Sequence, residues 1–218
     1  MVTLYDKAEC PFCWRVRMAL SVAGLAFEAH DHTKPPWSER WASLTDTGTV
    51  PVMEWDAEVW TDSADMLETL HTRSGPLWPV SADAARAHTR AWDSRLGKAI
   101  RQVVFEKRDK AENEWDLEVI QRGEADWLEA LPDLETALSG QVCFSAGFGT
   151  DVWLLPDLVL ATRFGMAAAY QLPLPESFPS LHAWFRTLAS QEWFTLTAPP
   201  RVLNRLEHNP WMATPSID

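Results

Sequence analysis

The sequence predicts a two-domain protein: an α/β N-terminal domain with the element order βαβ-ββα, followed by an all-α C-terminal domain. Before residue 74, short β-prone runs alternate with helical patterns, whereas the chain beyond residue 80 shows long helix-prone stretches. The residues between these regions include Gly75, Pro76 and Pro79, which is typical of a linker. We therefore expect a first domain over residues 1–75 and a second over residues 82–218.

The first expected elements are a strand, a loop and a helix. Residues 2–5 form a β-prone run, and a polar connection leads from it to Cys10. Pro11 is favoured at the first position of a helix, and apolar residues then recur at helical spacing for about three turns. Gly24 supplies the stop, and residues 25–30 are expected to form the second strand.

A hairpin and a capped helix complete the expected first domain. The polar, Trp-containing stretch over residues 35–48 is interpreted as a connection. Residues 50–55 and 58–61 flank a tight turn and predict a hairpin. Either Thr61 or Asp62 is expected to cap the helix that follows.

The C-terminal domain is expected to consist of helices. The four expected helices cover residues 82–110, 114–138, 152–170 and 178–189. The second is predicted to break near Gly123, and the third is the most apolar, so it is expected to be the central buried helix. The tail from Pro199 shows no strong period and is expected to lie on the surface.

The composition is that of an acidic globular chain, and it excludes some partners. The 218 residues carry a formal net charge of −12 with a pI near 4.9, which argues against a nucleic-acid ligand because such binding uses clustered Lys and Arg. There is no uncharged apolar run of 18 residues and no leader pattern at the start. We therefore expect a cytoplasmic protein without a membrane partner.

The most informative motif is the pair of thiols at residues 10–13, which read CPFC. The nucleophile in thiol chemistry is the thiolate, and a free cysteine with a pKa near ~8.5 is mostly protonated at neutral pH. At a helix N-cap, Cys10 faces unsatisfied N–H groups and the positive end of the helix dipole, which favour the thiolate. Lys7 and Arg15 are expected to add positive potential. Cys13, about one turn away, is expected to act as the resolving thiol.

Two structural interpretations compete with this chemistry. A C-x-x-C pair is half of a zinc site, but Cys143 stands alone, and His30 and His32 are the only other candidates that we consider. We therefore assign no metal. The second alternative is that both thiols are inert packing residues. Placement between a strand and a helix favours reactive thiols instead.

Three motifs, taken in order, resemble one known family. They are Cys10-Pro11-Phe12-Cys13, Thr49-Val50-Pro51 and Thr61-Asp62-Ser63. Together with the expected strands and helices, they resemble the glutathione transferase superfamily, in particular its cysteine-type members, which are the omega-type and two-domain glutaredoxin-like proteins. The resemblance extends over the whole chain. It implies a thioredoxin-like, glutathione-binding domain over residues 1–75, followed by an all-helical domain.

The resemblance also implies glutathione as the co-substrate. Pro51 is expected to be a cis-proline, and the main chain of Val50 to pair with the cysteinyl part of glutathione. Ser63 and its helix N-terminus are expected to receive the γ-glutamyl carboxylate, and Asp62 the ammonium group, although the family more often has Glu there. The implied binding residues are Pro11, Phe12, Thr49, Val50, Pro51, Asp62 and Ser63.

The second half departs from the family at one position. The family commonly has Ser or Thr three residues before the Asp of its buried helix, but here Leu154 precedes Asp157 at that spacing. Thr150 and Asp151 are candidates to cap an earlier start of the helix. Asp157 is expected to accept hydrogen bonds from main-chain amides in the core.

Three functions from different classes follow. The first is thiol transfer, in which Cys10 attacks a glutathionylated or disulfide substrate and glutathione or Cys13 resolves the adduct, as in deglutathionylation or dehydroascorbate reduction. The second is conjugation of glutathione to an electrophile, for which Tyr5 and Ser63 do not stand where a hydroxyl is expected. The third is a non-catalytic ligand-binding or interaction module. The expected partners are glutathione and a small-molecule or protein disulfide or electrophile; a homodimer, as in much of the superfamily, is left open.

Overall fold

The structure is a computed structural model that describes residues 1–212 and divides into two compact units. The first unit comprises Met1–Leu77 together with Glu192–Pro200, and the second comprises Trp78–Gln191 and the chain from Arg201. A segment near the end of the sequence thus belongs to the first unit. The division into domains at residues 1–75 and 82–218 stays a prediction.

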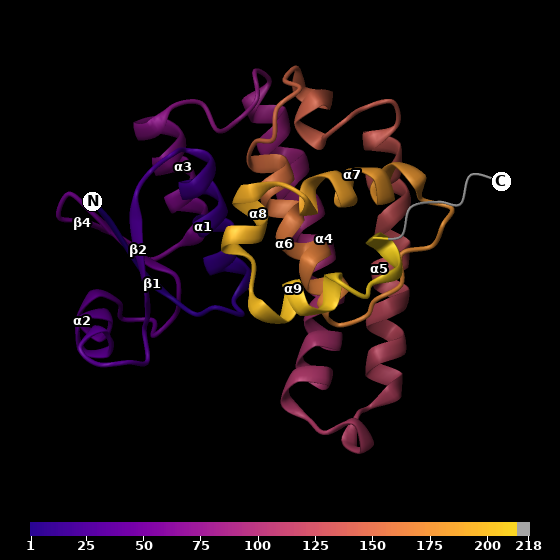
Figure 1. Cartoon of the computed structure of the whole chain (residues 1–218), viewed down its shortest axis with the longest axis horizontal. Helices are drawn as coiled ribbons and strands as arrows, with labels where there is room; N and C mark the ends of the chain where they lie inside the picture. The colour runs from indigo at the N-terminus through magenta and orange to yellow at the C-terminus, as the bar shows by residue number, and fades with distance from the viewer. Residues whose placement is uncertain (213–218) are drawn as a thin grey trace. The chain divides into compact units, whose positions relative to one another are not determined.

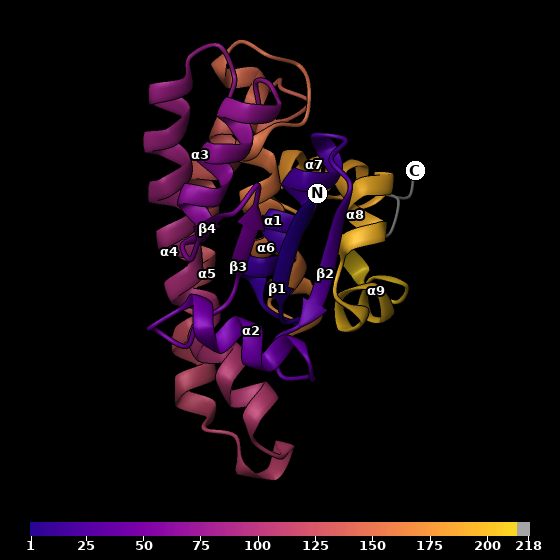
Figure 2. The ribbon, with the colours of Figure 1, turned by 90° about the vertical axis from the view of Figure 1, so that its left-hand side faces the viewer.

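The first unit is built on a mixed four-stranded sheet of order β2-β1-β3-β4, which Figure 2 shows with β3, β1 and β2 side by side. The strands are β1 (Val2–Asp6), β2 (Phe27–Asp31), β3 (Val52–Trp55) and β4 (Glu58–Trp60). β1 is parallel to β2 and antiparallel to β3, and β3 is antiparallel to β4. Asp56 and Ala57 join the last two strands with φ of 51° and 68°, so the predicted hairpin is confirmed.

Four helices belong to this unit. They are α1 (Pro11–Val22), α2 (Trp37–Leu44), α3 (Ser63–Ser74) and α8 (Glu192–Thr197). α1 packs against both α3 and α8, and these contacts can be followed in Figure 1. Gly24 has φ of +66° just after α1, which only glycine adopts readily, and so provides the predicted stop.

Helix α2 was not predicted, because residues 35–48 were interpreted as a connection without an element. None of its residues is buried, although Trp37, Trp41 and Leu44 recur at the i, i+4 and i+7 spacing of a helix. The helix lies against the sheet through rings instead. Trp37 stacks on His30 with centroids 3.5 Å apart and meets Tyr5 edge-on at 6.5 Å. These are tertiary contacts, which a local pattern does not show.

The second unit is helical, as predicted, and it surrounds one wholly buried helix. Its helices are α4 (Ala82–Asp109), α5 (Leu117–Leu138), α6 (Leu155–Ala169), α7 (Pro179–Ala189) and α9 (Pro200–Leu206). Short 3-10 turns cover Glu112–Glu114, Phe144–Phe148 and Pro210–Met212. Every residue of α6 is buried, which confirms the expectation of a central apolar helix.

The predicted break at Gly123 was wrong, because α5 runs through it without interruption. Gly123 instead lies where α5 meets α4, which runs alongside it in Figure 1. A Cβ at this position would stand 2.6 Å from Val103 Cγ2 and 3.0 Å from the Ala99 carbonyl oxygen. The glycine is therefore explained by close helix packing rather than by a turn.

Two further expectations for the second unit need correction. The tail from Pro199 is not irregular, because residues 200–206 form α9, and Trp211 beyond it is buried; residues 213–218 lie outside the described residues. Thr150 and Asp151 do not cap α6, whose N-cap is Leu154. Helix α9 has only seven residues, too few for a period to stand out.

No helix among residues 1–212 is long and apolar enough to cross a membrane.

Candidate active site

The sheet brings the three predicted motifs to one edge. β1 ends at Asp6, and the chain continues from there to Cys10. Because Tyr5 pairs with Val52, the start of β3 lies beside the end of β1, which places Pro51 at that edge. β4 returns antiparallel to β3 and therefore ends at the same edge, from which α3 begins. The register thus gathers segments that are far apart in the sequence.

Cys10 stands at the N-terminus of α1, as predicted. It is the N-cap residue, with extended φ and ψ of −85° and 121°, and Pro11 follows as the first helical residue. Cys10 is half-buried, whereas Cys13 is fully buried at 0% exposure. Phe12 is 42% exposed between them. One thiol can therefore meet a substrate directly, and the other lies beneath it.

The pKa values of the two thiols are shifted in opposite directions. The pKa of Cys10 is lowered to about 6, first by a hydrogen bond from the Cys13 side chain and then by the main-chain N–H groups of Cys13 and Phe12; burial opposes this. The pKa of Cys13 is raised, first by burial and then by its hydrogen bond to Cys10. At neutral pH the arrangement is a Cys10 thiolate that accepts a hydrogen bond from a Cys13 thiol.

A carboxylate also acts on the thiols. Asp6 raises the pKa of both Cys10 and Cys13. The positive potential expected from Lys7 and Arg15 stays a prediction. Arg15 lies over the Phe12 ring, 4.9 Å from its centroid. The N-terminus of α1 and the Cys13 thiol therefore stabilise the thiolate against an adjacent carboxylate.

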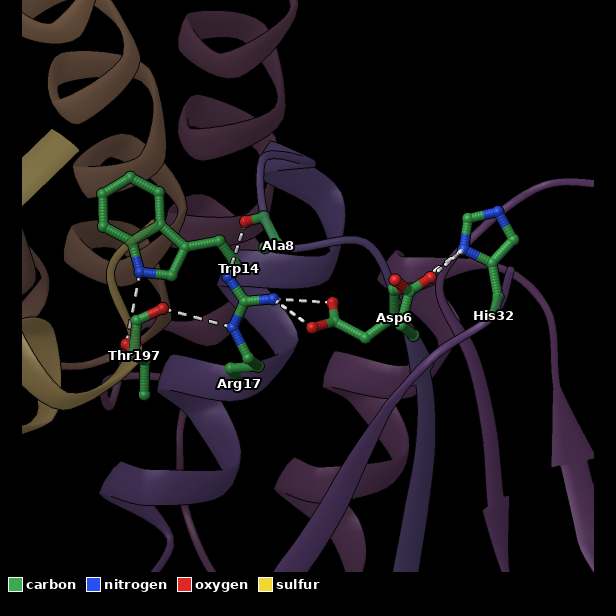
Figure 3. Close-up of polar contacts among 7 residues, drawn as sticks. Asp6, Ala8, Trp14, Arg17, His32 and Thr197 are labelled. Atoms are coloured by element: carbon green, nitrogen blue, oxygen red, sulfur yellow. Dashed lines mark hydrogen bonds and ion pairs between the residues drawn. The ribbon is translucent and has the colours of Figure 1, made fainter. Parts of the chain in front are cut away.

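A buried arginine, which the sequence did not single out, neutralises that carboxylate. Arg17 Nη1 donates to both carboxylate oxygens of Asp6 at 2.6 and 2.5 Å. Its Nη2 donates to the Ala8 carbonyl at 3.0 Å and its Nε to the Thr197 carbonyl at 3.2 Å, as Figure 3 shows. Residues 10, 13 and 17 share one helical face at i, i+3 and i+7 spacing, which is the signal that was available in the sequence.

Neighbouring contacts hold α8 and the end of β1 in place. Trp14 Nε1 donates to Thr197 Oγ1 at 3.2 Å, and the Trp14 ring meets Phe194 edge-on at 5.1 Å. His32 donates from Nδ1 to the main-chain carbonyl of Asp6 at 3.0 Å (Figure 3). The segment before Cys10 is therefore held from β1, from the residue after β2 and from α8.

The Thr49-Val50-Pro51 segment has the shape that the resemblance implies. The Val50–Pro51 bond is cis, and Pro51 is buried. The Thr49 carbonyl accepts from Trp41 Nε1 at 3.2 Å, and its hydroxyl bonds to Thr47 Oγ1 at 2.7 Å, so the carbonyl and hydroxyl of Thr49 are engaged. Within residues 1–212, no hydrogen bond involves the main chain of Val50.

At α3, Asp62 rather than Thr61 is the N-cap. Its Oδ1 accepts from the Ala64 and Asp65 amides at 2.7 and 3.3 Å. Ser63 is the first helical residue and is buried. One oxygen of Asp62 thus stabilises the helix start, and its other oxygen forms no hydrogen bond within the described part of the chain.

The remaining candidate groups are engaged elsewhere. Tyr5 donates its hydroxyl to Glu54 at 2.5 Å, and burial followed by that hydrogen bond raises its pKa to about 12. Cys143 is buried, and its pKa is raised to about 12, chiefly by burial. No group of three or more His, Cys, Asp or Glu side chains that could hold a metal ion occurs within residues 1–212.

Comparison with known proteins agrees with this arrangement. Residues 9–73 match the family model described as the glutathione S-transferase N-terminal domain. A glutathione S-transferase from Methylobacillus flagellatus, solved with glutathione bound, superposes with a TM-score of 0.74 at 20% identity and covers 91% of this chain and 100% of its own. The chain has the glutathione S-transferase fold. No curated protein is found to match its sequence.

Other glutathione transferase structures agree over most of both chains. The Rhodospirillum rubrum enzyme has a TM-score of 0.73 at 23% identity, covering 92% of this chain and 97% of its own. The theta-class enzyme from Xanthomonas axonopodis, with glutathione bound, has a TM-score of 0.72 at 19% identity, covering 90% and 96%. The thioredoxin-like sheet followed by an all-helical region is thus confirmed, and the family-model match covers residues 9–73 of the first unit.

Proposed function

We propose that this chain is a glutathione-dependent thiol transferase of the cysteine type, with Cys10 as the nucleophile. The observation that carries the proposal is the opposite ionisation of two adjacent thiols: an accessible one with a pKa of about 6 and a buried one whose pKa is raised. A thiol held as an anion at a helix start is suited to attack a disulfide sulfur. Glutathione is supported as the co-substrate by the matched N-terminal domain and by relatives solved with glutathione bound.

The reaction runs in two exchanges. The Cys10 thiolate attacks the glutathione sulfur of a glutathionylated substrate, so that a Cys10–glutathione disulfide forms and the substrate leaves as a thiolate, which takes a proton from water. A second glutathione, as its thiolate, attacks the glutathione sulfur of this disulfide. Oxidised glutathione leaves, and Cys10 returns as the thiolate. No oxidant beyond the substrate disulfide is required.

Cys13 is better suited to support Cys10 than to resolve the adduct. It is fully buried, and burial is the first cause of its raised pKa, so its thiolate form is disfavoured. As a thiol it donates the hydrogen bond that lowers the pKa of Cys10. Free glutathione therefore performs the second exchange.

Glutathione binds along the edge of the sheet where the three motifs meet. The Val50 main chain receives the cysteinyl part beside the cis Pro51, and Pro11 and Phe12 border the sulfur. Ser63 receives the γ-glutamyl carboxylate, and the second oxygen of Asp62 receives the ammonium group. Thr49 contributes the shape of the segment, because its hydroxyl and carbonyl are already bonded.

The proposed function is tested by measuring the rate at which the protein removes a glutathione adduct from a peptide. Cys10→Ser is expected to lower kcat/KM at least about 100-fold, because serine is not ionised at neutral pH. Since the pKa of Cys10 is lowered to about 6, activity is expected to persist at neutral pH and to fall as the pH decreases through about 6. A Cys10→Ser variant with the rate of the unaltered protein would overturn the proposal.

Variants of Cys13 separate its two roles. Cys13→Ser keeps a hydrogen-bond donor and is expected to retain turnover within a few-fold. Cys13→Ala removes the donor and is expected to raise the pKa of Cys10 by about one unit. Loss of turnover in Cys13→Ser, with Cys10 still reactive, would identify Cys13 as the resolving thiol instead.

Conjugation of glutathione to an electrophile ranks second. The Cys10 thiolate is the nucleophile at this edge, and the Tyr5 hydroxyl is bonded to Glu54 with a pKa raised to about 12. Conjugation of an aryl halide without disulfide exchange would favour this function. Binding of glutathione without turnover of either substrate would favour a non-catalytic module.

A further inference from the structure

We propose that Arg17 is a positioning residue for Cys10: it compensates the charge of Asp6 beside the thiol pair and ties the segment before Cys10 to α8. This inference rests on the proposed function, because it concerns how the same thiol is kept reactive. It assigns a role to residues outside the predicted site, and it makes α8, more than 180 residues from Cys10 in the sequence, part of the support of the thiol.

The contacts of Arg17 show why its position is specific. Arg17 is buried at 7% exposure, and its guanidinium reaches acceptors in three separate segments: Asp6 at the end of β1, Ala8 in the following loop and Thr197 at the end of α8. Its planar fork matches a carboxylate and leaves two further donors for carbonyls. Lysine at this position cannot make all of these bonds.

The electrostatic part follows from the burial of Asp6, which is 8% exposed. A carboxylate in such surroundings repels a nearby thiolate more strongly than it would in water. Asp6 acts in this sense on both Cys10 and Cys13. With Arg17 bound to both of its oxygens, the pair is close to neutral, so the thiolate faces a dipole rather than a full negative charge.

Other charged groups surround the thiol in sequence and in the sheet, and the test must separate them from Arg17. Within the first unit the charged or titratable side chains lie in the loop, on α1 and after β2: Lys7, Glu9, Arg15 and His32, with the neutral thiol of Cys13 beside them. Arg15 is directed to Phe12, and His32 bonds to the main chain of Asp6 rather than to its carboxylate. Arg17 forms a direct ion pair with Asp6.

Two single changes are expected to move the pKa of Cys10 in opposite directions. Arg17→Gln leaves Asp6 uncompensated and is expected to raise this pKa, whereas Asp6→Asn removes the repulsion and leaves Arg17, and is expected to lower it. The double variant Asp6→Asn with Arg17→Gln is expected to return close to the unaltered protein. A residue that only held the fold together would not produce shifts of opposite sign.

The experiment measures iodoacetamide alkylation of Cys10 against pH, localised by mass spectrometry. A rise of about one unit in Arg17→Gln corresponds to about fivefold slower alkylation near pH 6, and to no change near pH 9, where the thiol is ionised in both proteins. Arg73→Gln, which removes an arginine from the ion pair with Glu58 elsewhere in the same unit, is the matched control and is expected to change nothing.

Each outcome bears on the inference. Equal pKa values in the unaltered, Arg17→Gln and Asp6→Asn proteins overturn it, as do shifts of the same sign in both variants. If Arg17→Gln does not fold, Asp6→Asn and Arg17→Lys decide, since the first should lower the pKa of Cys10 and the second should leave it nearly unchanged. Alkylation needs no glutathione, so the two proposals can fail separately. Opposite pKa shifts without turnover of the peptide would support the role of Arg17 and refute the proposed function. Turnover of the peptide without pKa shifts would support the proposed function and refute the role of Arg17.

Discussion

The two units each bury a carboxylate, and they stabilise it in different ways. In the first unit, Asp6 is paired with Arg17, a cation that binds both of its oxygens. In the second, Asp157 is 0% exposed and accepts hydrogen bonds from the Phe144 amide at 2.8 Å, from the Ser145 amide and hydroxyl at 3.1 and 2.5 Å, and from Trp184 Nε1 at 2.9 Å. One site uses a counter-charge, and the other uses neutral donors alone.

This difference reflects what each carboxylate must do. Asp157 joins the turn over residues 144–148 to α6 and α7, and burial raises its pKa while the four hydrogen bonds oppose that rise. Its task is structural. Asp6 lies beside two thiols of opposite ionisation, where an uncompensated charge would change their chemistry. A counter-ion is therefore needed in the first unit and not in the second.

The largest loss of stability is expected when the Asp6 carboxylate of the first unit is removed. Asp6→Ala leaves the buried Arg17 guanidinium without its counter-charge and is expected to lower the free energy of unfolding by about 4 kcal/mol. Urea unfolding followed by tryptophan fluorescence gives this value. A double variant in which Arg17→Met accompanies Asp6→Ala should recover much of the loss. No recovery would mean that the packing of the arginine, rather than its charge, is what matters.

A smaller loss of stability is expected when the Asp157 carboxylate of the second unit is removed. Asp157→Ala leaves two amides, a hydroxyl and an indole N–H buried without their acceptor, and is expected to lower the free energy of unfolding by about 3 kcal/mol. Asp157→Asn keeps one acceptor oxygen and should lose about half as much. Alkylation of Cys10 should be unchanged in both variants, in contrast to the Asp6 variants. A changed rate would show that the two carboxylates are coupled.

The smallest loss of stability is expected at Asp62, a carboxylate that is exposed rather than buried. It shows how much a carboxylate contributes without burial. Asp62→Ala deletes the cap of α3 and is expected to cost about 1 kcal/mol in unfolding free energy. Asp62→Asn, which also caps well, should cost less than that. Under the proposed function both variants also raise the KM for glutathione, since each removes the charge that receives its ammonium group. An unchanged KM would restrict Asp62 to capping.

Much of the first unit could be predicted because its signals are local. The Cys10-Pro11 start of α1 and the Asp62 cap each follow from the preference of a residue type for one backbone position. The Asp56-Ala57 turn follows from the two short β-prone runs on either side of it. Asp157 was also expected to bind core amides, and it does. The added bond from Trp184 could not be foreseen, because its indole comes from another helix.

The parts that were missed depend on contacts between distant segments. The α2 helix carries no buried side chain and is fixed by Trp37 against His30. Trp37, Trp41 and Leu44 do recur at helical spacing, but the two prolines before them favour a connection. Gly123 has the local character of a helix break, but it serves the approach of α5 to Val103 on α4. The partners of Arg17 could not be predicted either, because an arginine in an apolar helix gives no sign of which carboxylate or carbonyl it will reach.

The membership of α8 in the first unit has a practical consequence for dissecting the molecule. A fragment cut after Leu77 would contain the whole sheet and Cys10, but it would lack Thr197 and Phe194. The indole of Trp14 would then lose both its hydrogen-bond acceptor and its ring neighbour, and Arg17 would lose one of its three acceptor segments. An isolated thioredoxin-like half of this chain should therefore be made with residues 192–200 added back, as a peptide or through a linker.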